Sequence, residues 1–175
     1  NADGSPPISV PFDEETLWNY EVGMKSEWWD NRIRVNAALY YLQWEDFQLE
    51  SFRFLTPGDL SSNFEQTINI DEAEAYGGEI EILAAVTDRL TFTMAYGYTD
   101  TEITDAPTAE ITGGFQVELE DLDLPKAPES QFAASAEYRL PIGNNEAWVQ
   151  LEFISRDGQY ADIEALTYKQ TDGPS

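Results

Sequence analysis

Apolar and polar residues alternate along most of this chain, and the clearest stretch is residues 75–98 (AYGGEIEILAAVTDRLTFTMAYGY). Side chains of a β-strand point to opposite faces in turn, so each half predicts a strand with one apolar and one largely polar face. Thr87, Asp88 and Arg89 interrupt the alternation and predict a tight turn. The stretch is interpreted as a β-hairpin whose arms have roughly ten alternating residues each, enough for tilted strands that cross a bilayer.

The same alternation recurs on both sides of this hairpin and predicts six long strands, at about 17–29, 33–50, 68–86, 90–103, 130–140 and 147–157. Short turns are expected at 30–32, 87–89 and 141–146, whereas the connections 53–67 and 100–129 are long and acidic. A bulge is expected near residues 44–47, and a short outer strand at 115–119. Short turns at one end and long loops at the other are typical of outer-membrane barrels.

The expected fold class is therefore all-β, an antiparallel up-and-down transmembrane β-barrel segment. Because closure takes about eight strands, six strands in three hairpins are expected to form an open curved sheet. The apolar face is expected to meet lipid. Its expected members in the central hairpin are Tyr76, Ile80, Ile82, Phe92, Met94 and Tyr96.

The polar face is expected to line the lumen and to carry Glu21, Lys25, Glu79 and Glu81. A hydrogen-bonded network that braces the wall is the favoured role for these four side chains, with contact to a ligand or a plug as the alternative. Glycines on the same face allow the close approach of another backbone, of which a plug is one candidate, or local strand curvature. They are Gly23, Gly77 and Gly97.

The amino-acid composition excludes several classes of function and disfavours others. The chain has 34 Asp and Glu against 9 Lys and Arg, a net charge of −25, which disfavours nucleic-acid binding because that needs cations to neutralise phosphates. It has no Cys and no His, which excludes thiol chemistry, Cys/His zinc sites and histidine bases, and no enzyme or cofactor is expected. No apolar stretch is long enough for a transmembrane helix. The sequence begins at Asn1 without an initiator Met, and a processed product or an excised piece is expected.

Two sets of residues are candidates for binding. Carboxylates of the long acidic connection could hold a hard cation such as calcium, although a solvated loop is the favoured interpretation because EF-hand spacing is lacking; they are Glu118, Glu120, Asp121 and Asp123. Aromatic residues at or near the long connections could pack against an organic iron chelate, with a girdle at the strand ends as the alternative for several; they are Trp44, Phe52, Phe54 and Phe115.

Four motifs, in this order, resemble the TonB-dependent outer-membrane receptors. They are YEVGMK at 20–25, RVNAALYY at 34–41, GGEIE at 77–81 and LPKAPE at 124–129. The resemblance implies a 22-stranded barrel with an N-terminal plug that imports iron–siderophore complexes or another scarce nutrient across the outer membrane, driven by the TonB complex. This chain would supply six strands from the C-terminal half. It lacks the family's plug, TonB box and terminal aromatic strand.

Two other interpretations stay open from the residues alone. One is an autonomous small outer-membrane barrel with a structural or adhesive role, and the other is a soluble acidic β-domain that binds calcium or a protein. The partners expected from the resemblance are an iron–siderophore or similar nutrient, outer-membrane lipid, and the TonB complex through the absent plug.

Overall fold

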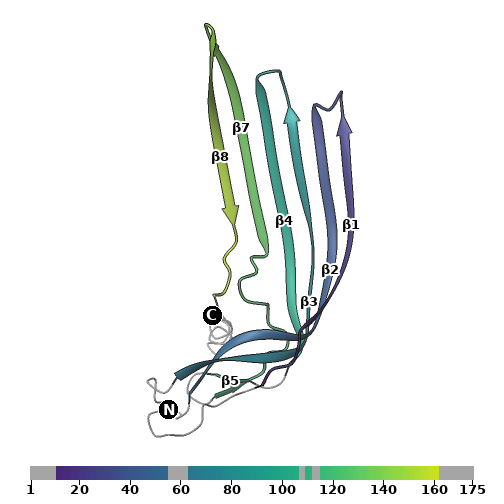
Figure 1. The fold of residues 1–175 in the computed structure, drawn as a ribbon, viewed down its shortest axis with the longest axis vertical. Coiled ribbons are helices and arrows are strands. Elements are labelled where there is room, and N and C mark those ends of the chain that lie inside the picture. The colour runs from purple at the N-terminus through teal and green to yellow at the C-terminus, as the bar shows by residue number, and fades with distance from the viewer. Residues whose placement is uncertain (1–10, 55–62, 107–108, 112–114, 162–175) are drawn as a thin grey trace, which may run out of the picture.

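The computed structural model describes residues 11–54, 63–106, 109–111 and 115–161. Six strands form one antiparallel sheet in the order β1-β2-β3-β4-β7-β8 (Figure 1). They are β1 (Thr16–Trp28), β2 (Ile33–Phe54), β3 (Asn63–Ala85), β4 (Leu90–Asp105), β7 (Ser130–Ile142) and β8 (Asn145–Arg156). The connection between β4 and β7 contains a second, two-stranded sheet of β5 (Ala109–Ile111) and β6 (Phe115–Val117). These described ranges contain no helix that is long and apolar enough to cross a membrane.

The all-β class and the open six-stranded sheet are confirmed. Within the described residues, β1 pairs only with β2 and β8 only with β7, so both edges of the sheet are open. Its strands have 12 to 23 residues, whereas strands of globular proteins commonly have about 5–6. The sheet thus has the length of a bilayer-spanning wall without being closed.

The strands β2 and β3 are longer than the alternation of the sequence indicates. The β2–β3 ladder continues from Phe47 opposite Ile70 to Phe54 opposite Asn63, although the expected ends were near residues 50 and 68. Backbone hydrogen bonds form regardless of the side chains, so a ladder can continue where the alternation stops. At the opposite end, the turn after β7 shrinks to two residues, with Gly143 in the left-handed region at a φ of 60°.

The register places the apolar positions of all six strands on one face. Across the sheet, Ala37 of β2 lies opposite both Met24 and Ile80, and Ile80 lies opposite Tyr96. The six residues expected on the apolar face of the central hairpin all lie there. Many apolar side chains of this face are highly exposed, including Leu39 at 64 %. In the described residues, then, no closed protein core covers this face.

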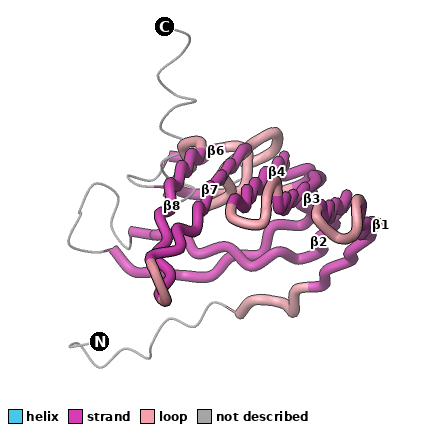
Figure 2. Tube along the Cα trace, turned by 90° about the horizontal axis from the view of Figure 1, so that it is seen from above, coloured by secondary structure: helices cyan, strands magenta, loops and turns pink. Residues whose placement is uncertain are grey.

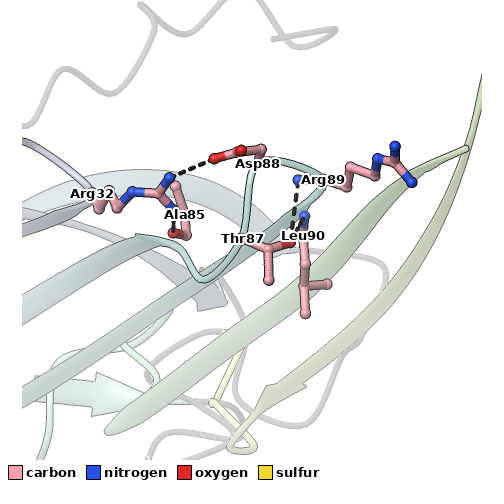
Figure 3. Close-up of polar contacts among 6 residues, drawn as sticks. All are labelled: Arg32, Ala85, Thr87, Asp88, Arg89 and Leu90. Atoms are coloured by element: carbon pink, nitrogen blue, oxygen red, sulfur yellow. Dashed lines mark hydrogen bonds and ion pairs between the residues drawn. The ribbon is translucent and has the colours of Figure 1, made fainter. Parts of the chain in front are cut away.

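The short turns of neighbouring hairpins are tied to each other (Figure 3). The Arg32 side chain, at the start of β2, forms an ion pair with Asp88 and donates a hydrogen bond to the Ala85 carbonyl oxygen at 3.3 Å. Within the second turn, the Thr87 hydroxyl oxygen accepts hydrogen bonds from the backbone N–H groups of Arg89 (3.2 Å) and Leu90 (2.9 Å). These contacts set the relative position of β2, β3 and β4 at this end.

At the opposite end, β2 and β3 bend sharply and sweep past the ends of β4, β7 and β8 (Figures 1 and 2). Asp46 has a φ of 56°, and the rings of Trp44 and Phe47 meet edge to face with centroids 5.8 Å apart. In a regular strand, residues three apart point to opposite faces, so this contact marks the expected break in alternation. The β2–β3 register is unchanged there; the register shift lies between Glu72 and Ala73, opposite β4.

This bent part has a small hydrophobic core. We call it the outer end (residues 46–54, 63–73, 100–106, 109–111 and 115–129), and we call the rest of the large sheet the wall. The core consists of Leu49, Ile70, Ala73, Ile103, Leu119, Leu122 and Leu124. The connection after β4 supplies three of its leucines, because it runs back along β4: Ile103 donates its backbone N–H to the Leu122 carbonyl at 2.8 Å. The stretch expected to be an acidic loop is therefore in part a packed segment.

Candidate functional site

The polar face of the wall carries all four charged residues predicted for the lumen. The register aligns Lys25 of β1 with Asn36 of β2 and Glu81 of β3 in one row, and Glu21 and Glu79 lie on the same face. Asn36 donates a side-chain hydrogen bond to Glu81 at 3.3 Å. All four predicted side chains are exposed on the open sheet.

Ion pairs on this face lie within and between strands. Arg34 of β2 pairs with Glu27 of β1 at 3.0 Å, and Arg139 pairs with Glu137 along β7 at 2.9 Å. Exposed pairs of this kind contribute about 0–1 kcal/mol each. These pairs do not include Glu21, Lys25, Glu79 or Glu81, whose bracing role stays a prediction.

Of the three glycines on the polar face, Gly77 has the least free space beside its Cα atom. The Tyr40 hydroxyl from β2 lies across it and bonds to the Thr99 hydroxyl of β4 at 2.5 Å. A Cβ atom at Gly77 would lie 2.7 Å from the Tyr40 hydroxyl oxygen and would also collide with the Tyr98 carbonyl oxygen. The close approach of another backbone predicted at Gly77 is made by the neighbouring strand β4 of the sheet itself, through the Tyr98 carbonyl, and the Tyr40 side chain lies close as well.

The other two glycines of the polar face have different surroundings. A Cβ at Gly23 would make only an ordinary contact, 3.6 Å from the Ala37 carbonyl oxygen, and a Cβ at Gly97 would meet nothing within 4 Å. Gly97 lies in an open hollow of about 740 Å³, whose lining includes Glu79, Glu81 and Arg156. In this hollow a glycine backbone, two carboxylates and a guanidinium are accessible together on the polar face.

The outer end folds toward this polar face rather than away from it. Ala75 and Thr101 are paired in register, lie one step beyond Gly77 and Thr99 on the same face, and are buried. The Thr101 hydroxyl accepts a hydrogen bond from the Leu124 backbone N–H at 3.0 Å, so the returning segment is anchored on that face. A ligand approaching the polar face from the long-loop end would thus meet the outer end first.

The aromatic residues predicted for ligand contact lie in or beside this outer end. Trp44 is half-buried and packs on the hydrophobic core together with Phe47. The sequence predicted ligand contact for Trp44 and did not predict this packing. The backbones of Phe52 and Phe54 lie in the β2 extension, and that of Phe115 begins β6. The side chains of these three phenylalanines lie outside the described residues.

The acidic residues of the returning segment point outward while the leucines between them point inward. Glu118, Glu120, Asp121 and Asp123 are exposed, whereas Leu119 is 1 % exposed. No group of three or more acidic side chains in the described part of the chain is arranged to hold a metal ion. The calcium hypothesis consequently finds no support in these four residues.

The opposite, apolar face ends in a row of tyrosines next to the outer end. Tyr20 and Tyr41 stack with ring centroids 6.3 Å apart, and the Tyr76 hydroxyl donates a hydrogen bond to Asp100 at 2.6 Å. Tyr98 donates to the same carboxylate at 3.4 Å. Aromatic rings with one wet edge are enriched where hydrocarbon meets water, so this row has the character of an interfacial girdle.

Comparison with known proteins agrees with this geometry. The sequence matches the family described as TonB dependent receptor-like, beta-barrel, over residues 2–174. A curated relative, the ferric-pyoverdine 358 receptor of Pseudomonas putida, is 30 % identical over 131 residues, which cover 75 % of this chain and 14 % of that receptor. No solved structure matches the chain. The resemblance seen in the sequence motifs is thereby confirmed: the chain belongs to the TonB-dependent receptor β-barrel family.

Proposed function

We propose that this chain forms one sector of the wall of an outer-membrane barrel, with its apolar face toward lipid and its polar face toward the lumen. The register carries this proposal, because it aligns the apolar positions of six strands on one continuous exposed face. A soluble sheet of this kind would need a second layer to cover that face. The open edges of β1 and β8 would pair with further strands to close the barrel.

The barrel is proposed to take up a ferric siderophore complex across the outer membrane of a Gram-negative cell. Support comes from the family and from the relative, whose name states that it is a receptor for ferric pyoverdine. The net charge of −25 makes a neutral or cationic complex the better match for the surface of this sector, since like charges repel an anionic ligand. The outer end, folded toward the polar face, is the proposed first contact of the ligand.

The energy is proposed to come from the TonB complex, acting on a plug domain outside this chain. Gly97 and the hollow around it offer that plug an accessible place on the lumen wall. The proposed activity is transport rather than catalysis. The remaining interpretations, an autonomous small barrel and a soluble acidic domain, have no specific observation in their favour.

Uptake of radioactive iron tests this function. Cells that lack the complete gene containing this sequence should lose uptake of one iron–siderophore complex from a panel, and restoring the gene should restore it. Removing TonB should abolish the same uptake. If the encoded protein stays monodisperse without detergent and does not sediment with outer membranes, the barrel interpretation is wrong.

A further inference from the structure

Two side-chain amides bind the segment that leads into β1 to the bent part of β2 and β3. We call residues 11–15 the entry segment; it passes the outer end before β1 begins (Figure 1). Gln48 and Asn69 are paired in register, and both bind the backbone of Asp13. Their neighbours in the ladder pack in or on the hydrophobic core, so the two amides lie on the opposite face of the bent sheet. The bent part is therefore held on both faces, by the core on one and by the entry segment on the other.

Asn69 makes three hydrogen bonds that join separate segments of the chain. Its side-chain oxygen accepts the backbone N–H of Asp13 at 2.8 Å, and its amide nitrogen donates to the Asp13 carbonyl oxygen at 3.2 Å. The same nitrogen donates to the Asp46 carbonyl oxygen at 2.7 Å. Because a carboxamide has one acceptor oxygen and two N–H donors, only this orientation of the side chain satisfies all three partners.

The contact with Asp46 lies at the bend itself. Asp46 has a φ of 56°, and the β2–β3 register passes from Glu45 to Phe47 without it. Its carbonyl oxygen is thus turned out of the regular ladder, and a backbone polar group in that position needs another partner. Asn69 supplies the partner and at the same time binds the entry segment, so it ties the bend to the chain that continues into β1.

Gln48 closes the edge of β2 beyond the first strand. In the described residues, the β1–β2 ladder begins at Thr16 opposite Glu45, and further along β2 this edge has no strand beside it. The Gln48 backbone N–H donates instead to the Glu15 carboxylate at 2.9 Å, and its side-chain amide donates to the Asp13 carbonyl oxygen at 3.1 Å. Side chains therefore replace a ladder here, and single substitutions can remove the contacts while the strands of the wall keep theirs.

We propose that Asn69 is a positioning residue for ligand capture, which fixes the outer end over the polar face by binding the bend and the entry segment together. This proposal rests on the proposed function, in which the outer end is the first contact of the ligand. It goes beyond that function because it assigns a role to a side chain that touches no ligand and acts only through the position of the bent part.

Distances between two spin labels test the position directly, in the complete protein that contains this sequence and with no other cysteine. Glu50→Cys in the outer end and Glu152→Cys in the wall place both labels on exposed residues. Asn69→Asp keeps the size and the acceptor but replaces both donors by a carboxylate facing two carbonyl oxygens, and should widen the distance distribution about twofold. Gln48→Met, which removes one hydrogen bond, should widen it less, and Asn145→Ala, at an exposed asparagine of the opposite end, should leave it unchanged.

Uptake of the radioactive iron complex that requires the gene gives the second measurement. Asn69→Asp should raise the Kd for the complex on whole cells about fivefold and leave the maximal uptake rate unchanged, because the residue positions the capturing surface and does not drive transport. A substitution that only destabilised the protein would lower the maximal rate through the amount of receptor and leave the Kd as it was. The amount of receptor in the outer membrane is measured alongside.

The other outcomes contradict one of the two proposals. An unchanged distance distribution in Asn69→Asp, or a widened one with an unchanged Kd, overturns the positioning role. Equal changes in Asn145→Ala would show a general effect of losing an asparagine and would overturn it as well. A wild-type protein that takes up no complex of the panel overturns the proposed function, whereas normal wild-type uptake with an unaltered Asn69→Asp variant overturns only the role of Asn69.

Discussion

The strands β2 and β3 run through both the wall and the outer end, yet the two regions are stabilised in opposite ways. In the wall, large apolar residues such as Leu39 and Leu151 are 64 % and 73 % exposed. In the outer end, Ile70 and Ile103 are 0 % exposed and pack on leucines from the returning connection. The wall is thus joined by its backbone ladder and leaves its apolar side chains uncovered, whereas the outer end has a core of the kind found in water-soluble proteins.

Because of this contrast, the largest loss of stability is expected when a substitution creates a cavity in the core of the outer end. Ile103→Ala should destabilise it by about 2–5 kcal/mol, because Ile103 is fully buried in the small core. Hydrogen exchange should then accelerate in the outer-end parts of β2 and β3 and stay unchanged in the wall. Ile142→Ala is the control, because Ile142 is 60 % exposed near the short turn. Equal effects of the two substitutions would contradict a core confined to the outer end.

The second largest loss of stability is expected when a charge is placed on the apolar face of the wall rather than on its polar face. If the apolar face meets lipid as proposed, Leu39→Arg should destabilise the folded protein in a bilayer by up to about 2–4 kcal/mol, the cost of a cation on the lipid face at the midplane. The neighbouring residue Ala38 points to the polar face, so Ala38→Arg should cost much less. Urea-induced unfolding from lipid vesicles measures both. A larger loss of stability for Ala38→Arg than for Leu39→Arg would mean that the face of Ala38, and not that of Leu39, meets the lipid.

A smaller loss of stability is expected when a methyl group is added at a tightly packed glycine of the wall. Gly77→Ala should destabilise by about 1–3 kcal/mol, because the added methyl group meets the Tyr40 hydroxyl and the Tyr98 carbonyl oxygen. Gly97→Ala should be close to neutral, since its Cβ meets nothing within 4 Å. The same unfolding measurement compares the pair. If Gly97→Ala costs as much as Gly77→Ala, the general flexibility of glycine and not the tyrosine contact decides the result.

The smallest loss of stability is expected when the contacts between the two short turns are removed. Arg32→Ala removes an ion pair and a hydrogen bond between two turns, but both charged side chains are largely exposed. We expect a loss of about 0–1 kcal/mol that shrinks at high salt, because counterions screen exposed charges. Unfolding at low and at high ionic strength checks this. A loss of several kcal/mol that is independent of salt would show that the turn is more tightly packed than the structure indicates.

Much of the wall could be predicted from the sequence because its rule is local. Strict alternation decides which side chains share a face, and the arms around residues 75–98 carry enough of it to place Ile80 and Glu81 on opposite faces. The short turns were also recognisable, since Asp30 and Asn31 tolerate the left-handed backbone that they adopt there. The fold class and the family motifs followed from these regular segments.

The outer end was harder to predict because its stability comes from residues far apart in the chain. Leu119, Leu122 and Leu124 are separated by acids, and their spacing fits no strand or helix period, so the segment resembled a solvated loop. Their burial depends on β2 and β3 bending at Asp46 and bringing Ile70 beside Ile103. The presence of three leucines among the acids, rather than their spacing, was the signal that could have indicated a packed segment.

The sequence by itself therefore determined the strands, their two faces and the family, because period-two alternation and short motifs are properties of neighbouring residues. Only the tertiary structure decided which contacts those faces make. It showed that Tyr40 occupies the space over Gly77, that Trp44 packs on a core, and that the outer end folds toward the polar face. These depend on the register between strands and on one bend, and both are set by contacts between residues distant in sequence.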